Sequence, residues 1–313
     1  MRKAVTLLEL LVVLAVIWLL TALLLPAVQS VRQAADRLAC RSKLRQIALA
    51  SHHYEQIHGN LPPAFKRRRP KEPLPHLQWP IHLAVCLEQE ATFREAVEDY
   101  GNDKRVYQAK SQHRGMNRPM SILSCPTDTR LTQSRKVTLL DRIPNRLFDL
   151  DVAAMSYLGV SGTDSRYCNG MMTADQGISL VAVSDGTSNT LFFGERPPPI
   201  GFEYGWLYAG DGQDGFGSLD SVLGVRDRNQ TGVNRSAELY VVVTGYRSCG
   251  PGPFAYAPPG ADRKCDAFRF WSLHVGGANF AFADGSVRFL NYGADAVLPA
   301  LATRAGGEVV SLE

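Results

Sequence analysis

A long apolar run opens the chain and passes directly into an amphipathic pattern. From Val5 to Leu25 it contains one charged residue, Glu9, and neither glycine nor proline. As a helix this run spans about 31 Å, roughly the hydrocarbon core of a bilayer. We therefore predict a membrane-spanning helix over residues 5–28.

The pattern beyond this run predicts that the same helix continues. Residues 29–58 contain good helix formers and neither glycine nor proline. Gly59-Asn60 ends the helix, and Pro62-Pro63 prevents its return. The helix should therefore have one half in the membrane and one half packed on a globular head. Its packed face follows the spacing i, i+4, i+7, i+11 and i+14, at Cys40, Leu44, Ile47, Ser51 and Tyr54.

Shorter patterns outline the head. Residues 81–100 predict an amphipathic helix with one apolar stripe, and residues 197–260 predict long loops with short strands. The stripe consists of Phe93, Ala96, Val97 and Tyr100. Strands are predicted at 123–125, where the chain turns at Pro126, at 156–162 and at 190–195, and a strand or short helix at 178–184.

The clearest local signal is a hairpin near the C-terminus. Residues 278–283 alternate large and small side chains, Asp284-Gly285 follows, and a second alternating run covers 286–290. Asp-Gly between two such runs predicts a two-residue type I′ turn, which needs positive φ at both positions. The predicted fold class is α+β, with a long N-terminal helix against a head built on an antiparallel sheet.

Composition narrows the class of protein further. The chain has 313 residues, enough beyond the apolar run for one large or two small domains. Its net charge of +4 is too weak to indicate a nucleic-acid partner. The six cysteines permit disulfides in an exported head, with 15 possible complete pairings. We prefer a bridge between Cys249 and Cys265, and interpret Cys40 and Cys86 as buried thiols within helices.

Few residues in the sequence suggest a catalytic or metal-binding site. His274 and Asp284 are open to interpretation as a catalytic or metal pair, but the Asp-Gly turn accounts for the aspartate, and we favour a histidine that caps the hairpin. Neither a serine-hydrolase elbow nor a helical zinc pair of histidines occurs in the sequence. We therefore expect neither an enzyme nor a cofactor. The one weak metal candidate is a calcium loop at Asp211, Asp214 and Asp220, whose Asp-Gly pairs are also turn formers.

A basic loop at residues 66–71 has two interpretations. The run Lys-Arg-Arg-Arg-Pro-Lys suits contact with an acidic polymer or lipid head groups. A solvated surface loop is the simpler interpretation, and we favour it.

Residues 5–13, Val-Thr-Leu-Leu-Glu-Leu-Leu-Val-Val, follow a short basic leader. They resemble the N-terminus of type IV prepilins and type II secretion pseudopilins, where Phe-Thr-Leu-Val-Glu-Leu-Leu-Val-Val follows the cleavage point. The resemblance implies cleavage between Ala4 and Val5, N-methylation of Val5, a role for Glu9 in assembly, and a helix kink at Pro26. This chain departs from the family at Ala4, where glycine is usual, and at Val5, where phenylalanine is usual.

A narrower resemblance covers nearly the whole chain. His274, nine further residues and Asp284-Gly285 look like the H-x9-DG signature of prepilin-like proteins of planctomycete-type bacteria, a family of unknown biochemical function. Further blocks agree in order along the chain, at 52–63, 79–89, 123–128 and 185–195. These blocks identify a family and do not indicate a reaction.

The two resemblances imply a domain order and a location. The expected segments are a leader at 1–4, an assembly helix at 5–28, its continuation at 29–60, and a head at 61–313 with the H-x9-DG hairpin at 274–290. The implied location is the bacterial inner membrane, in a single pass with the N-terminus cytoplasmic and the head extracytoplasmic. The expected partners are a prepilin peptidase, other pilin or pseudopilin subunits and the membrane, with no specific nucleic acid or small molecule.

Two classes of function remain open. The first is a pseudopilin-like or minor-pilin subunit that assembles through residues 5–28. The second is an extracytoplasmic binding protein or enzyme that uses this segment only as a tether. A secretory signal peptide fits less well, because residues 27–29 make a poor cleavage site. The positive-inside count alone favours the opposite orientation, since only Arg2 and Lys3 precede the span, so the cytoplasmic N-terminus comes from the resemblance. Five cations follow the span closely: Arg32, Arg37, Arg41, Lys43 and Arg45.

Overall fold

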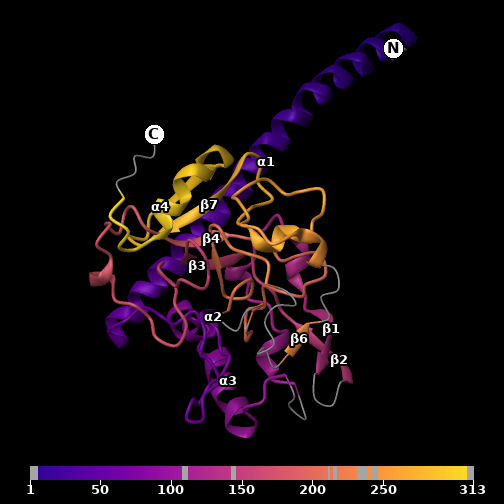
Figure 1. The fold of residues 1–313 in the computed structure, drawn as a ribbon. Coiled ribbons are helices and arrows are strands. Elements are labelled where there is room, and N and C mark those ends of the chain that lie inside the picture. Colours follow the sequence, from indigo (N-terminus) through magenta and orange to yellow (C-terminus); the bar gives the residue numbers. More distant parts are fainter. Residues whose placement is uncertain are drawn as a thin grey trace.

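The N-terminal helix dominates the molecule. The structure, a computed structural model, describes residues 6–107, 112–141, 146–210, 212–213, 217–230, 239–241 and 246–308. Helix α1 (Leu7–His58) runs through Pro26 without ending, and its first half projects from the head as an isolated rod (Figure 1). It ends as predicted at Gly59, whose φ of 79° is left-handed and whose amide donates to Glu55 O.

The described part of the head contains two sheets. The larger has the strand order β5-β3-β4-β7-β8, and only the pairing of β3 with β5 is parallel. Its strands are β3 (Tyr157–Gly162), β4 (Leu191–Glu195), β5 (Val222–Gly224), β7 (Gly277–Phe282) and β8 (Val287–Asn291). The smaller sheet, in the order β2-β1-β6, is antiparallel and consists of β1 (Arg135–Asp141), β2 (Arg146–Val152) and β6 (Leu239–Val241).

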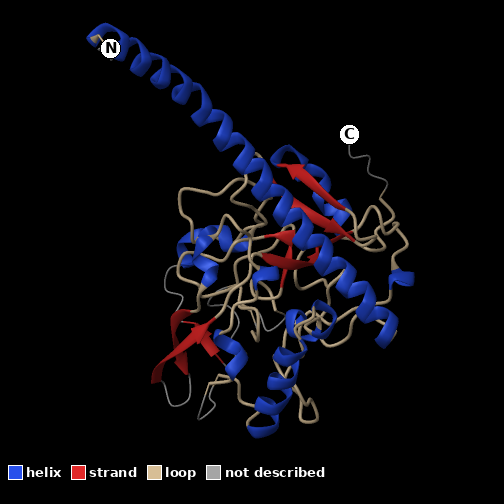
Figure 2. Ribbon diagram, turned by 180° about the vertical axis from the view of Figure 1, so that it is seen from behind, coloured by secondary structure: helices blue, strands red, loops and turns tan. Residues whose placement is uncertain are grey.

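The second half of α1 lies across the larger sheet and packs on β4, β7 and β8 (Figure 2). Its buried face contains Cys40, Leu44, Ile47 and Ser51, as the spacing predicted, and Tyr54, the fifth predicted position, is partly buried against the core. The molecule is therefore an α+β protein in which a long N-terminal helix packs on a largely antiparallel sheet, which confirms the predicted fold class.

The prediction of a single helix over residues 81–100 is wrong. The chain forms α2 (Trp79–His82), a 3-10 turn and then α3 (Glu90–Asn102). The break falls at Glu88, whose positive φ of 59° cannot continue a right-handed helix. Of the predicted stripe, Ala96 and Tyr100 are buried while Val97 stays exposed.

Short 3-10 helices decide two other predictions. The strand end predicted at 123–125 is wrong, because Ser121–Leu123 is a 3-10 helix and residues 124–125 form no strand. Of the two options predicted for residues 178–184, the short helix forms, at Leu180–Ala182. The C-terminal helix is α4 (Leu298–Ala302). The 3-10 helices are Val85–Leu87, Arg114–Asn117, Ser121–Leu123, Thr129–Thr132, Leu180–Ala182, Tyr246–Cys249, Cys265–Phe268 and Tyr292–Val297.

The hairpin of β7 and β8 forms where predicted, but its turn differs. The amide of Gly285 donates to Phe282 O at 2.9 Å, and the amide of Phe282 donates to Ser286 O at 2.8 Å. Only Gly285 has a positive φ, at 81°, and Asp284 does not. These features define a three-residue loop that ends in a left-handed glycine, in place of a type I′ turn. Asp284 instead uses its carboxylate to accept from the amide of Ser286 at 2.8 Å.

Candidate functional site

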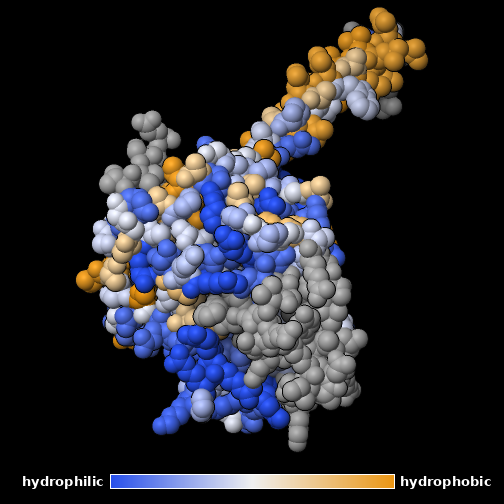
Figure 3. All heavy atoms as spheres, in the orientation of Figure 1, coloured by the Kyte–Doolittle hydropathy of each residue, from blue (hydrophilic) through white to orange (hydrophobic). Residues whose placement is uncertain are grey.

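The outer half of α1 is apolar and uncovered. It is the one helix among the described residues that is long and apolar enough to cross a membrane, and none of its apolar window is buried by the head. Leu7 and Trp18, for example, are 77% and 75% exposed. Figure 3 shows this segment as a hydrophobic rod that leaves a mostly polar head. Such a surface is stable only in lipid or against other apolar helices.

Glu9 lies in the first turn of this helix and takes part in its N-terminal cap. Its carboxylate accepts from the amide of Thr6 at 2.9 Å, and its amide donates to Thr6 Oγ1 at 3.3 Å. This reciprocal pair is a capping box, which satisfies amides that the first turn of a helix leaves free. The carboxylate is thus held at the very start of the helix. Ala4 and Val5, the predicted cleavage site, lie outside the described residues.

The inner half of α1 is fastened to the head by polar contacts as well as by its buried face. Lys43 Nζ donates to the carbonyls of Ser121 and Ser124, at 2.6 and 2.8 Å. Partial burial lowers the pKa of Lys43 below its ordinary value. One turn from the end, Glu55 Oε1 accepts from the amide of Leu180 at 2.7 Å. These contacts hold the helix at both ends of its packed half.

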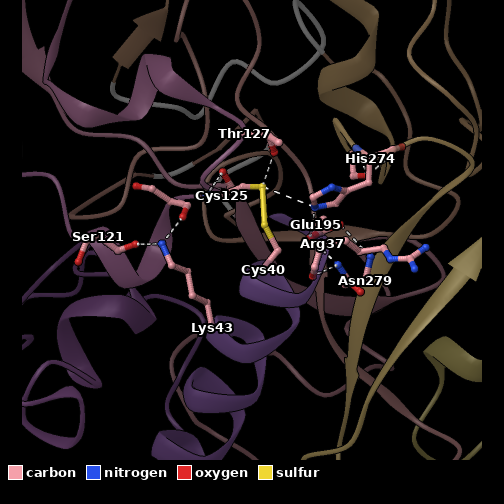
Figure 4. Close-up of a disulfide and its surroundings, with 12 residues drawn as sticks. Arg37, Cys40, Lys43, Ser121, Cys125, Thr127, Glu195, His274 and Asn279 are labelled. Atoms are coloured by element: carbon pink, nitrogen blue, oxygen red, sulfur yellow. Dashed lines mark hydrogen bonds and ion pairs between the residues drawn. A yellow bond between two sulfur atoms is a disulfide. The ribbon is translucent and has the colours of Figure 1, made fainter. Parts of the chain in front are cut away.

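The most unusual group of side chains lies where α1 first meets the head. Cys40 of α1 forms a disulfide with Cys125, which leads out of the 121–123 turn (Figure 4). The imidazole of His274 lies beside this bond, with Nε2 3.7 Å from Cys125 Sγ and 3.4 Å from Glu195 Oε1. All four side chains are buried, at 0–8% exposure. Glu195 ends β4, so four separate parts of the chain converge at this point.

Asn279 fixes the carboxylate of this group. Its backbone amide donates to Glu195 Oε2 at 2.8 Å, and its side-chain amide donates to Glu195 Oε1 at 3.0 Å. The same side-chain amide reaches the carbonyl of Arg37 on α1 at 3.5 Å. The cluster therefore links the helix, β4 and β7.

His274 is not the hairpin cap that we expected. It precedes β7, whereas Asp284 and Gly285 follow that strand, so the two halves of the H-x9-DG signature lie at opposite ends of β7. The turn is held from α1 instead, because His52 Nε2 lies 2.8 Å from Ala283 O. The separation of His274 and Asp284 also removes the catalytic or metal pair that we had considered.

Of the predictions made for the cysteines, the preferred bridge is confirmed and the buried thiol at Cys40 is wrong. The structure joins Cys249 to Cys265 by a disulfide, the bridge preferred from the sequence. The interpretation of Cys40 as a buried thiol is wrong, because its partner Cys125 lies 85 positions along the chain. Cys86 is a thiol, and its partial burial raises its pKa.

The calcium candidate is only partly within the described residues. Asp211 and Asp214 lie outside them. Asp220 is buried, and its two oxygens accept from the amides of Gly205 and Gly212 at 3.0 and 2.8 Å. It also lies near the buried Arg196, whose pKa is lowered to about 10 because burial outweighs the attraction of Asp220. Asp220 thus serves backbone amides and a buried cation.

Two arginines of the basic loop pair with Asp175, which lies outside the loop. Arg67 Nε and Arg69 Nη2 donate to Asp175 Oδ2 at 2.7 and 2.6 Å, and Lys66 Nζ donates to Asp175 O. Partial burial acts to raise the pKa of Asp175, but the hydrogen bonds and charges of Arg67 and Arg69 outweigh it and lower the pKa below its ordinary value. This geometry favours the interpretation as a surface loop.

The sequence predicted neither Glu195 nor Asn279 as part of a site. Its only signal was indirect: Cys125, Glu195 and His274 each lie in one of the blocks that carry the second resemblance. Nothing in their spacing predicts that they meet.

These features define an α+β protein with a polar head and a single N-terminal helix able to span a membrane. The chain belongs to the family described as protein of unknown function (DUF1559), which matches residues 29–296. The match begins at the packed half of α1 and leaves the apolar run outside. No curated protein matches the chain, and no solved structure does.

Proposed function

We propose that the chain is a pseudopilin-like or minor-pilin subunit, with a structural and not an enzymatic role. A prepilin peptidase cuts it between Ala4 and Val5 and methylates the new N-terminus. The outer half of α1 then takes the subunit from the membrane into a type II secretion or type IV pilus-like filament.

One observation carries this proposal: a single helix joins an exposed apolar half to a half that is fixed in the head. Cys40, Lys43 and Glu55 fasten the packed half along its length. A continuous helix held in this way passes any displacement of its N-terminal half to the head as a rigid body. Assembly into a filament requires that property, whereas a tether does not.

Glu9 supports the same function. A carboxylate in the middle of a bilayer costs about 2.5–3.5 kcal/mol, and somewhat less near the end where Glu9 lies. An anchor gains nothing from it. Cleavage after Ala4 would create an amine at Val5, four residues before Glu9, and an ion pair with the amine of a neighbouring subunit would favour leaving the lipid.

Two of the five cations that follow the span also hold α1 to the head. The Arg37 guanidinium lies 4.8 Å from the centre of the Phe289 ring, and Lys43 is bound to two carbonyls of the head. The positive-inside count still favours the opposite side, so the orientation rests on the resemblance of residues 5–13 to prepilins. We infer that the head is extracytoplasmic and that the membrane is the bacterial inner membrane.

The test compares Glu9→Leu with Thr21→Leu in cells that carry the filament system and its peptidase. Both variants replace a polar side chain in the span by leucine, and Thr21 only bonds carbonyls within its own helix. Breaking a buried ion pair costs about 3–5 kcal/mol, so Glu9→Leu should lower the ratio of sheared-filament to membrane-pool subunit by about a hundredfold or more. Thr21→Leu should leave that ratio unchanged.

Mass spectrometry of the mature parent supplies a second measurement. The expected mass lacks residues 1–4 and gains one methyl group. An intact Met1, together with an unchanged ratio for Glu9→Leu, would show that the segment is only a tether, and the anchored binding protein or enzyme would then replace this proposal.

A further inference from the structure

The disulfide between Cys40 and Cys125 explains two of the four side chains that meet beneath α1, but not the other two. A structural disulfide needs neither an imidazole nor a carboxylate beside it. Here the donor atoms of Cys40, Cys125, Glu195 and His274 all lie within 4.8 Å of one another. Their side chains are buried and come from four separate parts of the chain. The arrangement is that of a ligand set around a common centre.

Both distances from His274 Nε2, to Glu195 Oε1 and to Cys125 Sγ, fit a tetrahedral zinc ion. Zinc bonds of about 2.3 Å to sulfur, 2.0–2.1 Å to nitrogen and 2.0–2.2 Å to oxygen place tetrahedral neighbours about 3.4 Å apart for N and O and about 3.6 Å apart for N and S. The observed separations are 3.4 Å from His274 Nε2 to Glu195 Oε1 and 3.7 Å from His274 Nε2 to Cys125 Sγ. The two sulfurs, which are bonded in the disulfide, must separate to about 3.8 Å, and all donor pairs already lie within 4.8 Å.

The donor chemistry also selects zinc. Two thiolates and an imidazole are soft or borderline ligands, which suit zinc and disfavour magnesium or calcium. The carboxylate is held by the two Asn279 donors described above, and such outer hydrogen bonds orient the ligands of metal sites. Structural zinc sites are closed and four-coordinate, as this buried cluster would be.

We propose that the reduced chain binds one Zn²⁺ through Cys40 Sγ, Cys125 Sγ, His274 Nε2 and Glu195 Oε1, in place of the disulfide. A dithiol reductant gives two electrons and two protons to the S–S bond, becomes a disulfide itself and leaves two thiols. Zn²⁺ then displaces the two thiol protons, which pass to the solvent, and binds neutral His274. The disulfide and the bound Zn²⁺ cannot be present at the same time, because both use the two cysteine sulfurs. Either one links α1 to the head. This inference is independent of filament assembly.

The test uses the full chain in detergent micelles, reduced by a phosphine that does not bind zinc. Titration with Zn²⁺ should find one tight equivalent per chain, and Co²⁺ should give the visible spectrum of a tetrahedral ion with thiolate ligands. Re-oxidation to the disulfide should weaken zinc binding at least tenfold. This comparison uses a single sequence, so it holds even where a variant fails to fold.

Variants then assign the ligands. His274→Ala and Glu195→Gln should each weaken zinc binding at least tenfold in the reduced chain. The paired variant Cys249→Ala/Cys265→Ala removes the other bridge, which with Asp262 forms a second and more exposed group of donors, and should leave the affinity unchanged. Cys86→Ser is the matched single-thiol control and should also bind as the parent does.

Three results would overturn the proposal. They are equal zinc affinity of the reduced and oxidised chains, an octahedral cobalt spectrum, and loss of the tight equivalent in Cys249→Ala/Cys265→Ala but not in His274→Ala.

Discussion

The two disulfides should stabilise the protein by different amounts, because they close loops of different length. Cys40–Cys125 joins residues 85 positions apart and Cys249–Cys265 joins residues 16 positions apart. By the entropy of loop closure in the unfolded chain, these separations correspond to about 4.6 and about 3.1 kcal/mol at 25 °C. Replacing each pair by alanine removes the same atoms. The Cys40/Cys125 variant should therefore lose about 1.5 kcal/mol more of the free energy of unfolding.

The assay is urea unfolding of both paired variants and the parent, as full chains in micelles with a chelator that removes zinc. The fluorescence of Trp79, Trp206 and Trp271 reports on the head, since all three are buried. Equal slopes against urea would show that the transitions expose the same surface. A Cys249/Cys265 variant that loses as much as the Cys40/Cys125 variant, or more, would refute the argument from loop length.

Three further perturbations test the packing of the helix, the hairpin turn and the loop anchor. Leu44→Ala on the buried face of α1 should cost about 2–5 kcal/mol in urea unfolding, whereas Leu49→Ala, 51% exposed on the same helix, should stay within about 0.5 kcal/mol. Gly285→Ala puts a side chain at a φ of 81° and should lower the free energy of unfolding by about 1–2 kcal/mol. Gly101→Ala, inside α3 with open space around it, should instead raise that free energy by about 0.5–1 kcal/mol. Equal effects of the two substitutions would contradict the turn geometry. The pKa of Asp175 in the folded protein lies below its ordinary 3.8, so the stability that this carboxylate contributes is present above that pH and is lost as the pH falls through the lowered pKa. The difference in free energy of unfolding between the parent and Asp175→Asn should therefore shrink below about pH 4 in acid unfolding curves. A difference that grows there would have the wrong sign.

Elements that depend on neighbouring residues could be predicted from the sequence. The apolar run, the helical spacing from Cys40 to Ser51 and the stop at Gly59 placed α1 (Leu7–His58) almost to the residue. The alternation around Asp284 likewise placed the hairpin. These patterns work because helix and strand periodicity are repeated every few residues, and each repeat is visible in the chain itself.

The geometry of the turns could not be predicted from these local patterns. The hairpin takes a three-residue loop and not a two-residue one, and Glu88 breaks a helix whose apolar stripe looked continuous. Both outcomes depend on what the flanking segments pack against. Several turn types are compatible with one Asp-Gly pair, and a stripe does not reveal that the chain must change direction beside α1.

The buried cluster was decided by the tertiary structure alone. Cys125 lies 85 positions from Cys40 and 149 from His274, and no periodic pattern connects residues so far apart. Their meeting depends on the register of β4 against β7, which places Glu195 beside Asn279, and on the angle at which α1 crosses that sheet. The sequence by itself determined that one long helix has an apolar half able to span a membrane and a second half that packs on a sheet. Which side chains meet beneath the helix follows only once strand pairing has brought distant segments together, because contacts of this kind are set by the geometry of the whole sheet and not by any local run of residues.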